Sequence, residues 1–377
     1  TMGITITKDF ECGNIRVVSA SNHRDIRLEI EKDGKADFYQ WFYFRVDMEP
    51  GPRTIRIENA AGASYPQGWV GYQACYSTDQ KTWQRAPTRY EDGVLTIEHE
   101  VAKRTVYYAY FAPYTAEEGA AFLDRMEKDP KATRIKLGQS LDGRPIDALQ
   151  FGEGSELKRT IWVIARQHPG EAMGSHFAEG FCETLVSADH SMAQELLRQA
   201  VVYVVPMMNP DGVARGHLRT NAAGTDLNRS WAEPSMKESP EVALVLKKME
   251  ETGCDLFLDA HGDEAIANNF IDGSEGIPSW QPRLAELLAT FKNQLIEATP
   301  DFQDKHGYPI NGAGKANLSI ANNAIAERFL CLSMTLEMPF KDAMTNPKPQ
   351  EGWSPRRCQE LSVHTIEVMS RLVSRLR

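Results

Sequence analysis

The sequence lacks any long apolar run, because no segment approaches the roughly 18 consecutive apolar residues that a membrane-spanning helix needs. Its first residues, TMGITITKDF, also lack the charged stretch followed by an apolar one that marks a secretory leader. The six cysteines are widely spaced and form no C-x-x-C pair, which argues against a disulfide framework and predicts reduced thiols. We therefore expect a cytoplasmic protein without a membrane partner.

The sequence also has fewer positively charged than negatively charged side chains. The chain has 42 lysines and arginines against 52 aspartates and glutamates, and its formal net charge is -10 at pH 7. With no basic tract, this balance predicts no nucleic-acid partner and no long-range attraction of acidic substrates. Any preference for an acidic substrate would depend on basic groups inside the binding site.

The length of 377 residues exceeds what one core usually supports, so we expect two domains, residues 1–112 and 113–377. The first contains seven short alternating runs separated by turn residues, which predicts an all-β sandwich. These runs are residues 15–18, 26–30, 41–46, 54–57, 69–76, 94–98 and 105–111. The aromatic stretch from Trp41 to Phe44 is expected in the sandwich core.

The pattern changes to alternating strands and helices from about residue 113. Apolar runs predict strands at residues 161–165, 201–205, 254–260 and 332–338, and a hairpin from the runs at 133–137 and 146–151. Helical patterns occupy residues 116–128, 172–187, 194–199, 240–252, 282–299 and 357–376. Strands bounded by helices predict an α/β domain, with a mixed sheet flanked by helices on both faces.

Two short motifs at the ends of predicted strands carry the residue types of a catalytic metal site. His168 and Glu171 lie in His-Pro-Gly-Glu after the strand at 161–165, and His261 lies in Asp-Ala-His-Gly after another strand. A hydrolytic zinc ion needs three ligands from His, Glu or Asp and one open position for water. Because an H-x-x-E pair also arises by chance, the rest of the sequence must support this interpretation.

A polar loop and a strand carboxylate provide that support. The loop follows the strand at 201–205 and an expected turn at Asn209–Gly212, and it carries Arg219, Asp226, Asn228 and Arg229. Arginine forks bind carboxylates bidentately, so the loop favours a ligand with an anionic end group. Glu337 lies inside the apolar strand at 332–338, where a carboxylate is costly to bury. We interpret Glu337 as a general base, with a paired structural acid as the alternative.

The order of these motifs resembles that of the zinc metallocarboxypeptidases, the carboxypeptidase A-like peptidases. H-P-G-E, N-P-D-G, D-x-N-R-x-W, D-x-H and T-x-E follow one another along residues 135–377. The stretches Phe10–Asn14, Gln40–Phe44 and Tyr107–Thr115 are similar to the N-terminal β domain of the cytosolic carboxypeptidases. That subgroup includes eukaryotic enzymes that trim glutamates from protein tails, and bacterial relatives. The resemblance covers almost the whole chain.

The resemblance implies the catalytic groups. It assigns one zinc ion per chain to His168, Glu171 and His261. Asp226 would hydrogen-bond a zinc-bound histidine and so fix its tautomer. Glu337 would take a proton from the attacking water and pass it to the leaving amine.

Other residues are implied to contact the peptide. Arg219 would polarise the scissile carbonyl, and it is preferred over Arg215 because of its position relative to the D-x-N-R motif. Asn228 and Arg229 would hold the terminal carboxylate of the substrate, which implies an exopeptidase. Tyr308 is the nearest candidate for a tyrosine that closes over the substrate, and a loop tyrosine that caps core surface is the alternative.

The preferred C-terminal residue stays open at this stage. Lys315 is the basic residue available for a glutamate side chain, with a solvated loop lysine as the alternative. Asn317 stands where an arginine is expected in the deglutamylating relatives, which argues against a glutamate preference. The expected partners are therefore peptide or protein C-termini, and the oligomeric state is left open.

Two other functions remain as alternatives. A zinc deacylase of the aspartoacylase type would keep the metal residues and the base but cleave N-acyl amino acids. A non-catalytic zinc-containing protein would use its aromatic β domain to recruit a partner. The D-x-N-R-x-W loop followed by T-x-E favours the carboxypeptidase over the deacylase, and the presence of all catalytic residue types argues against the non-catalytic protein. Because no zinc or carboxylate-binding candidate precedes residue 168, we expect the β domain to be structural and partner-directing.

Overall fold

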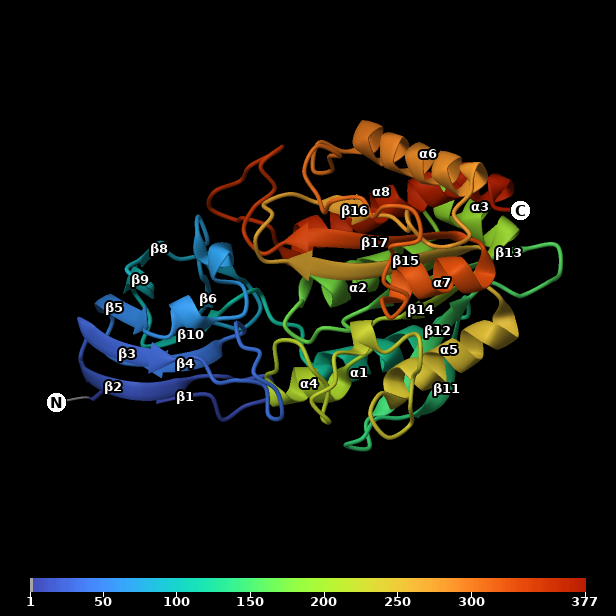
Figure 1. Ribbon diagram of the computed structural model, residues 1–377. Helices are drawn as coiled ribbons and strands as arrows, with labels where there is room; N and C mark the ends of the chain where they lie inside the picture. Colours follow the sequence, from blue (N-terminus) through green and yellow to red (C-terminus); the bar gives the residue numbers. More distant parts are fainter. Residues whose placement is uncertain (1–2) are drawn as a thin grey trace.

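The computed structural model describes residues 3–377 and shows two parts side by side (Figure 1). The first part, the β-sandwich domain, consists of two five-stranded sheets, as the sequence predicts. One sheet has the order β1-β4-β10-β6-β7, with strands at Thr5–Thr7, Tyr43–Asp47, Thr105–Ala109, Cys75–Ser77 and Gln84–Arg85. The other has the order β2-β3-β5-β9-β8, with strands at Arg16–Asn22, Asp25–Glu29, Gly51–Ile57, Val94–Val101 and Thr88–Glu91.

The core of the β-sandwich domain is aromatic. All four residues from Trp41 to Phe44 are buried, as predicted. The strand predicted at Trp69–Tyr76 is wrong, because Pro66–Trp69 forms a 3-10 turn and only Cys75–Ser77 is extended. Two features interrupt the extended backbone there: Pro66 at the start of the turn and Gly71, whose φ is +75°.

The second part, the α/β domain, is built on a seven-stranded mixed sheet with the order β11-β12-β14-β13-β15-β17-β16. The four strands β14, β13, β15 and β17 are parallel, and β12 and β16 join them antiparallel. Their bounds are β11 Ala132–Gln139, β12 Pro145–Phe151, β13 Arg159–Ala165, β14 Ala200–Val205, β15 Leu256–Asp263, β16 Phe270–Asp272 and β17 Leu332–Pro339. The mixed sheet confirms the predicted fold class.

Helices cover both faces of this sheet (Figure 1). The helices α1 (Ala116–Glu127), α2 (Met173–Val186), α3 (Ser191–Gln199), α6 (Pro282–Ala298) and α8 (Pro355–Leu372) share one apolar core. The helices α5 (Pro240–Thr252) and α7 (Ala321–Phe329) share the other, and α7 was not predicted. Because side chains alternate along a strand, Ile161 and Val163 of β13 enter the first core, whereas Trp162 and Ile164 enter the second.

The expected turn at Asn209–Gly212 is instead the start of a short helix, α4 (Pro210–Arg215). Asn209 Oδ1 accepts a hydrogen bond from the Gly212 amide at 3.0 Å, and Pro210 occupies the first helical turn. Asparagine and proline favour turns, but the same residues also begin helices, so the local sequence did not separate the two. No helix within residues 3–377 is long and apolar enough to cross a membrane.

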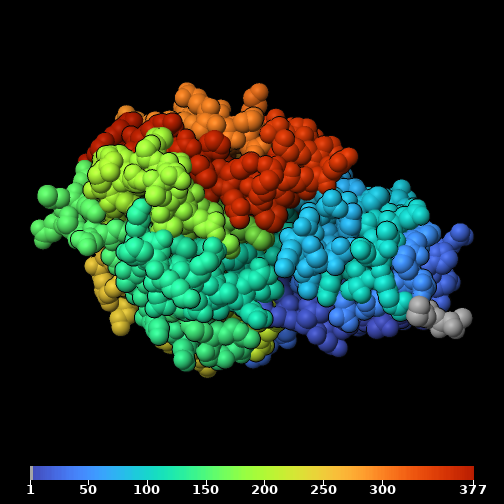
Figure 2. Space-filling view, turned by 180° about the vertical axis from the view of Figure 1, so that it is seen from behind, coloured from blue at the N-terminus to red at the C-terminus, as the bar shows by residue number. Residues whose placement is uncertain are grey.

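The two domains meet along the loop that follows β17. In the reverse view, the red surface of the C-terminal part of the chain lies against the blue and cyan surface of the β-sandwich domain (Figure 2). Arg85 Nη2 donates to the carbonyl oxygens of Phe340 and Trp353, at 2.8 and 2.7 Å. The ring of Tyr110 stacks on Phe340 with 4.4 Å between ring centroids. The contact is therefore both polar and aromatic.

Candidate active site

Parallel strands place the predicted metal ligands and base at one edge of the sheet. β13 leads into the loop that holds His168 and Glu171, while β15 holds His261 and β17 holds Glu337. His261 and Glu337 are direct partners in the register of β15 and β17. Residues far apart in the sequence therefore meet where the strands end, as is typical of α/β sheets.

Arg166 fixes the turn that follows β13. Its φ of +67° lies in the left-handed region, which is unfavourable for a residue other than glycine. The buried guanidinium compensates, because it donates to the carbonyl oxygens of Pro169 and Tyr114, at 2.7 and 2.9 Å, and to Ser175 Oγ at 3.1 Å. These bonds hold the loop in the conformation that aims its histidine and glutamate at the same point.

His168, Glu171 and His261 form one buried cluster. Nδ1 of His168 lies 2.8 Å from Glu171 Oε2, and Nδ1 of His261 lies 2.9 Å from Glu171 Oε1. One ligand atom from each residue lies within 4.8 Å of the other two. Two imidazole nitrogens and one carboxylate are the donor set of a catalytic zinc site, so these residues fit zinc and would hold it.

Two aspartates orient the histidines from the side away from Glu171. His168 Nε2 contacts Asp226 Oδ1 at 2.9 Å, and His261 Nε2 contacts Asp259 Oδ2 at 2.6 Å. Each carboxylate favours the tautomer with its proton on Nε2, which leaves Nδ1 free to bind a metal. The sequence predicts this contact for Asp226 but not for Asp259. The available signal was the spacing of Asp259 and His261, which puts both side chains on one face of β15.

Gln167 is a second residue that sequence reasoning missed. Its Nε2 donates to Asp259 Oδ2 at 2.6 Å and to Asn228 Oδ1 at 3.1 Å, and its Oε1 accepts from Trp231 Nε1 at 2.8 Å. Gln167 therefore connects the aspartate behind His261 to the polar loop. No local motif signals this role, because all three contacts join distant parts of the chain.

The polar loop between β14 and α5 carries the predicted carboxylate-binding residues, Asn228 and Arg229. Arg229 Nη1 donates to the carbonyl oxygen of Asn228 at 2.8 Å. Asn228 Oδ1 accepts from Gln167 and from the Ala321 amide at 2.9 Å, so no acceptor capacity faces outward and its Nδ2 group remains available as a donor. Arg215 lies elsewhere and pairs with Asp142 at 2.8 Å.

Glu337 is 6% exposed, and its Oε2 has no hydrogen-bond partner in the described part of the chain. Burial raises the pKa of Glu337 well above its usual range, against the opposing influence of His261. A dication held by the neighbouring ligands would favour the ionised carboxylate and so counter this shift. An unpaired carboxylate beside a metal site is suited to proton transfer.

A cavity of about 460 Å³ brings these residues together. Its lining includes His168, Glu171, Arg219, Asn228, Arg229, His261, Tyr308 and Glu337. The hydroxyl of Tyr308 donates to Asp263 Oδ2 at 2.5 Å. Lys315 is exposed and is not among the lining residues.

The β-sandwich domain also lines this cavity, through Tyr65 and Gln67. Arg219 Nη1 donates to the hydroxyl of Tyr65 at 2.6 Å. The domain therefore reaches the cavity, and the expectation that it is structural and partner-directing rather than catalytic stays a prediction. Tyr65 lies in no motif, and it reaches the site only because the two domains pack together, so the sequence pattern gave no signal.

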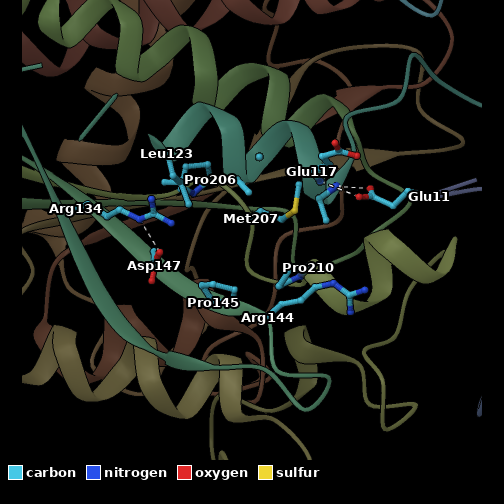
Figure 3. A pocket seen from close by; sticks show the side chains of 13 residues that line it. Glu11, Glu117, Leu123, Arg134, Arg144, Pro145, Asp147, Pro206, Met207 and Pro210 are labelled. Carbon is cyan, nitrogen blue, oxygen red and sulfur yellow. Dashed lines mark hydrogen bonds and ion pairs between the residues drawn. The ribbon is translucent and has the colours of Figure 1, made fainter. Parts of the chain in front are cut away.

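A separate cavity of about 250 Å³ lies between α1 and β12 (Figure 3). It contains none of the predicted site residues. Several of its charged groups already have partners, because Arg134 pairs with Asp147 at 2.8 Å and Glu11 accepts from the first two amides of α1. Asp147 Oδ1 is a buried atom without a hydrogen-bond partner in residues 3–377, but its other oxygen already pairs with Arg134.

Comparisons with known proteins give a family match for each part of the chain. Residues 6–111 match the family model described as cytosolic carboxypeptidase N-terminal domain, and residues 120–351 match zinc carboxypeptidase. A metallo-carboxypeptidase from Pseudomonas aeruginosa, solved in complex with (2-guanidinoethylmercapto)succinic acid, is 42% identical with a TM-score of 0.97. That match covers 99% of this chain and 100% of the other.

Two further relatives extend this result. A metallo-carboxypeptidase from Burkholderia cenocepacia is 39% identical, with a TM-score of 0.96 over 98% of this chain and 99% of the other. Cytosolic carboxypeptidase 6 from Mus musculus is 30% identical over 72% of this chain, which covers 55% of the mouse protein. This chain therefore spans about half the length of that eukaryotic relative.

Proposed function

This chain belongs to the zinc carboxypeptidase family and carries the N-terminal domain of the cytosolic carboxypeptidases, and we propose that it hydrolyses the C-terminal peptide bond of peptides or proteins. One observation carries the proposal. The carboxylate-binding candidates Asn228 and Arg229 line the same cavity as the metal cluster and Glu337. That arrangement allows a terminal carboxylate and the adjacent peptide bond to be held together.

The predicted catalytic and carboxylate-binding residues of the cavity have separate roles in this reaction. Zinc held by His168, Glu171 and His261 would supply Lewis acidity, which lowers the pKa of water so that it can lose a proton and attack near neutral pH. Glu337 accepts the proton of that water and returns it to the leaving amine. Arg219 donates to the carbonyl oxygen as negative charge develops on it. The Nδ2 group of Asn228 and the free donors of Arg229 bind the terminal carboxylate.

The residue preference follows from the charges in the cavity. Asp272 lies opposite Thr335 in the register of β16 and β17, on the same face as Glu337 two residues further on. Burial raises the pKa of Asp272 to about 6, with Glu275 adding to the shift and Lys292 opposing it. No ion pair or side-chain hydrogen bond of Asp272 occurs within residues 3–377. An unpaired carboxylate at this depth favours a cationic ligand group.

We therefore propose that the cavity accepts a basic C-terminal residue, lysine or arginine, in place of the glutamate that the sequence left open. Asp263 and Glu264 also line the cavity, whereas Lys315 does not. The Pseudomonas aeruginosa relative binds a ligand that combines a guanidino group with succinic acid. A guanidino group and a carboxylate together have the charges of a C-terminal arginine.

A peptide series that varies only in its last residue tests both proposals. Products are identified by mass spectrometry, and kcat/KM is measured for lysine, arginine, glutamate and phenylalanine termini. The basic termini should be cleaved fastest, and Asp272→Asn should remove that advantage while Asp189→Asn, at an exposed position outside the lining, should not. Faster cleavage of the glutamate peptide by the wild type contradicts the basic preference but leaves the carboxypeptidase proposal standing.

The deacylase and the non-catalytic protein are not favoured, because both family models that match belong to carboxypeptidases. N-acyl amino acids in the same assay, with a chelator control, distinguish all three functions. We also propose a cytoplasmic location, supported by the match to the cytosolic carboxypeptidase N-terminal domain. Fractionation of cells that express the protein tests that location.

A further inference from the structure

A segment of the β-sandwich domain holds the loop that carries Arg219. The Cys12 amide donates to the Ala214 carbonyl at 3.1 Å, and Asn14 Nδ2 donates to the Gly216 carbonyl at 3.0 Å. Gly216 has a φ of +73°, and a Cβ there would lie 2.4 Å from the carbonyl oxygen of Gly13. The two backbones approach so closely that only glycine fits at this position.

Asp33 forms the centre of this contact. It is 4% exposed and comes from the β-sandwich domain. Its carboxylate accepts from the amides of Leu218, Arg219 and Thr220, at 2.7, 3.0 and 2.8 Å, and from Thr220 Oγ1 at 2.8 Å. No arginine or lysine pairs with Asp33 in the described part of the chain, so three amides and one hydroxyl of the loop satisfy this buried carboxylate. One carboxylate therefore fixes three consecutive residues.

The side chain of Arg219 is held by the same domain. Nη1 donates to the Tyr65 hydroxyl at 2.6 Å, and the guanidinium carbon lies 5.5 Å from the ring centroid of Phe38. Nε donates to Asp226 Oδ2 at 2.7 Å, and the other oxygen of Asp226 contacts His168. With Nε and Nη1 engaged, Nη2 is the nitrogen left without a partner in residues 3–377, on a side chain that lines the cavity.

We propose that Asp33 and Tyr65 are positioning residues for catalysis, so that the β-sandwich domain completes the active site. They fix the backbone and the guanidinium of Arg219 and thereby direct its Nη2 donor at the carbonyl oxygen of the scissile bond. The inference rests on the proposed role of Arg219. It requires no contact between Asp33 and the substrate, because Asp33 acts through the loop alone.

The first test is Tyr65→Phe, which removes the hydroxyl but keeps the ring beside Arg219. Loss of a hydrogen bond to a charged donor should lower kcat about tenfold, with KM and zinc content nearly unchanged. Tyr39→Phe is the matched control, because the Tyr39 hydroxyl donates to Asn59 inside the β-sandwich domain at 2.8 Å. Asp33→Asn is the second variant, and it should lower kcat by about ten- to a hundredfold, since an amide donor would face a backbone donor.

A double-variant comparison separates positioning from general structural damage. Tyr65→Phe and Asp33→Asn are each repeated in an Arg219→Ala background, where no guanidinium remains to be positioned. Both should then change kcat by less than about twofold, because coupled residues are not additive. Effects that multiply in this background, or a Tyr65→Phe enzyme with wild-type kcat, overturn the proposal. A wild-type kcat for Arg219→Ala alone instead refutes the catalytic role of Arg219 and leaves the carboxypeptidase activity itself untouched.

Discussion

Amidation of the substrate should strongly slow hydrolysis, because it removes the group that Asn228 and Arg229 are arranged to bind. Asn228 Oδ1 is already occupied by Gln167 and by the Ala321 amide, so only its Nδ2 donor can reach the substrate. Arg229 likewise offers donors only. A terminal carboxamide lacks the negative charge, and its NH₂ group would face one of these donors.

The size of the effect follows from these contacts. A hydrogen bond to a charged group contributes about 1.5–3 kcal/mol, and leaving a buried donor without a partner costs about 1–3 kcal/mol. Together they predict a loss of at least about 2.5 kcal/mol in transition-state binding, or roughly a hundredfold or more in kcat/KM. Pairs of peptides that differ only at the terminus, followed by mass spectrometry, measure this ratio.

Variants of two loop arginines test the attribution to Arg229. Arg229→Ala should slow cleavage of the free-acid peptide and bring the two forms closer together. Arg215→Ala should leave the ratio unchanged, since Arg215 pairs with Asp142 outside the cavity. If the wild-type enzyme cleaves free-acid and amidated peptides at similar kcat/KM, or cuts internal bonds, the reasoning about this loop is refuted.

Three other predictions concern the metal, the base and stability. Elemental analysis of the purified protein should find about one zinc ion per chain, and the His261→Ala variant should lose this zinc. Stoichiometric zinc in a variant that lacks both His168 and His261 would contradict the ligand set. Glu337→Gln should retain zinc and substrate affinity but lose most of its turnover, and near-wild-type kcat would show that another group is the base. Burial raises the pKa of Glu241 from 4.5 to about 7, so the native state holds its proton more tightly than the unfolded chain and stability falls as pH rises through this range. Glu241→Gln should therefore gain Tm relative to the wild type at pH 8 but not at pH 4, and an equal difference at both pH values would contradict this.

The sequence predicts the centre of the α/β domain well, because buried parallel strands appear as continuous apolar runs. β14 is an example, since all six of its residues are buried. Short elements were harder to predict. α4 begins with residues that also favour a turn, and the stretch before β6 is apolar without being extended. In these places tertiary contacts decide the conformation.

The candidate site shows the same division. His168, Glu171 and Glu337 have local signals, because metal ligands and a buried carboxylate are unusual residue types in their sequence surroundings. Asp33 and Tyr65 have none. Both lie in loops of the β-sandwich domain, and their contacts with the Arg219 loop span more than 150 residues. Their significance arises from domain packing, which local patterns do not encode.

The contact between Asp33 and the Arg219 loop also limits how such chains can be recombined. A hybrid that joins the β-sandwich domain of one relative to the α/β domain of another must bring together two loops that fit each other in backbone detail. At Gly216 even one additional carbon would collide with the backbone carbonyl of Gly13. The two loops must therefore be taken from the same relative. A hybrid gene joined at the domain boundary would separate them.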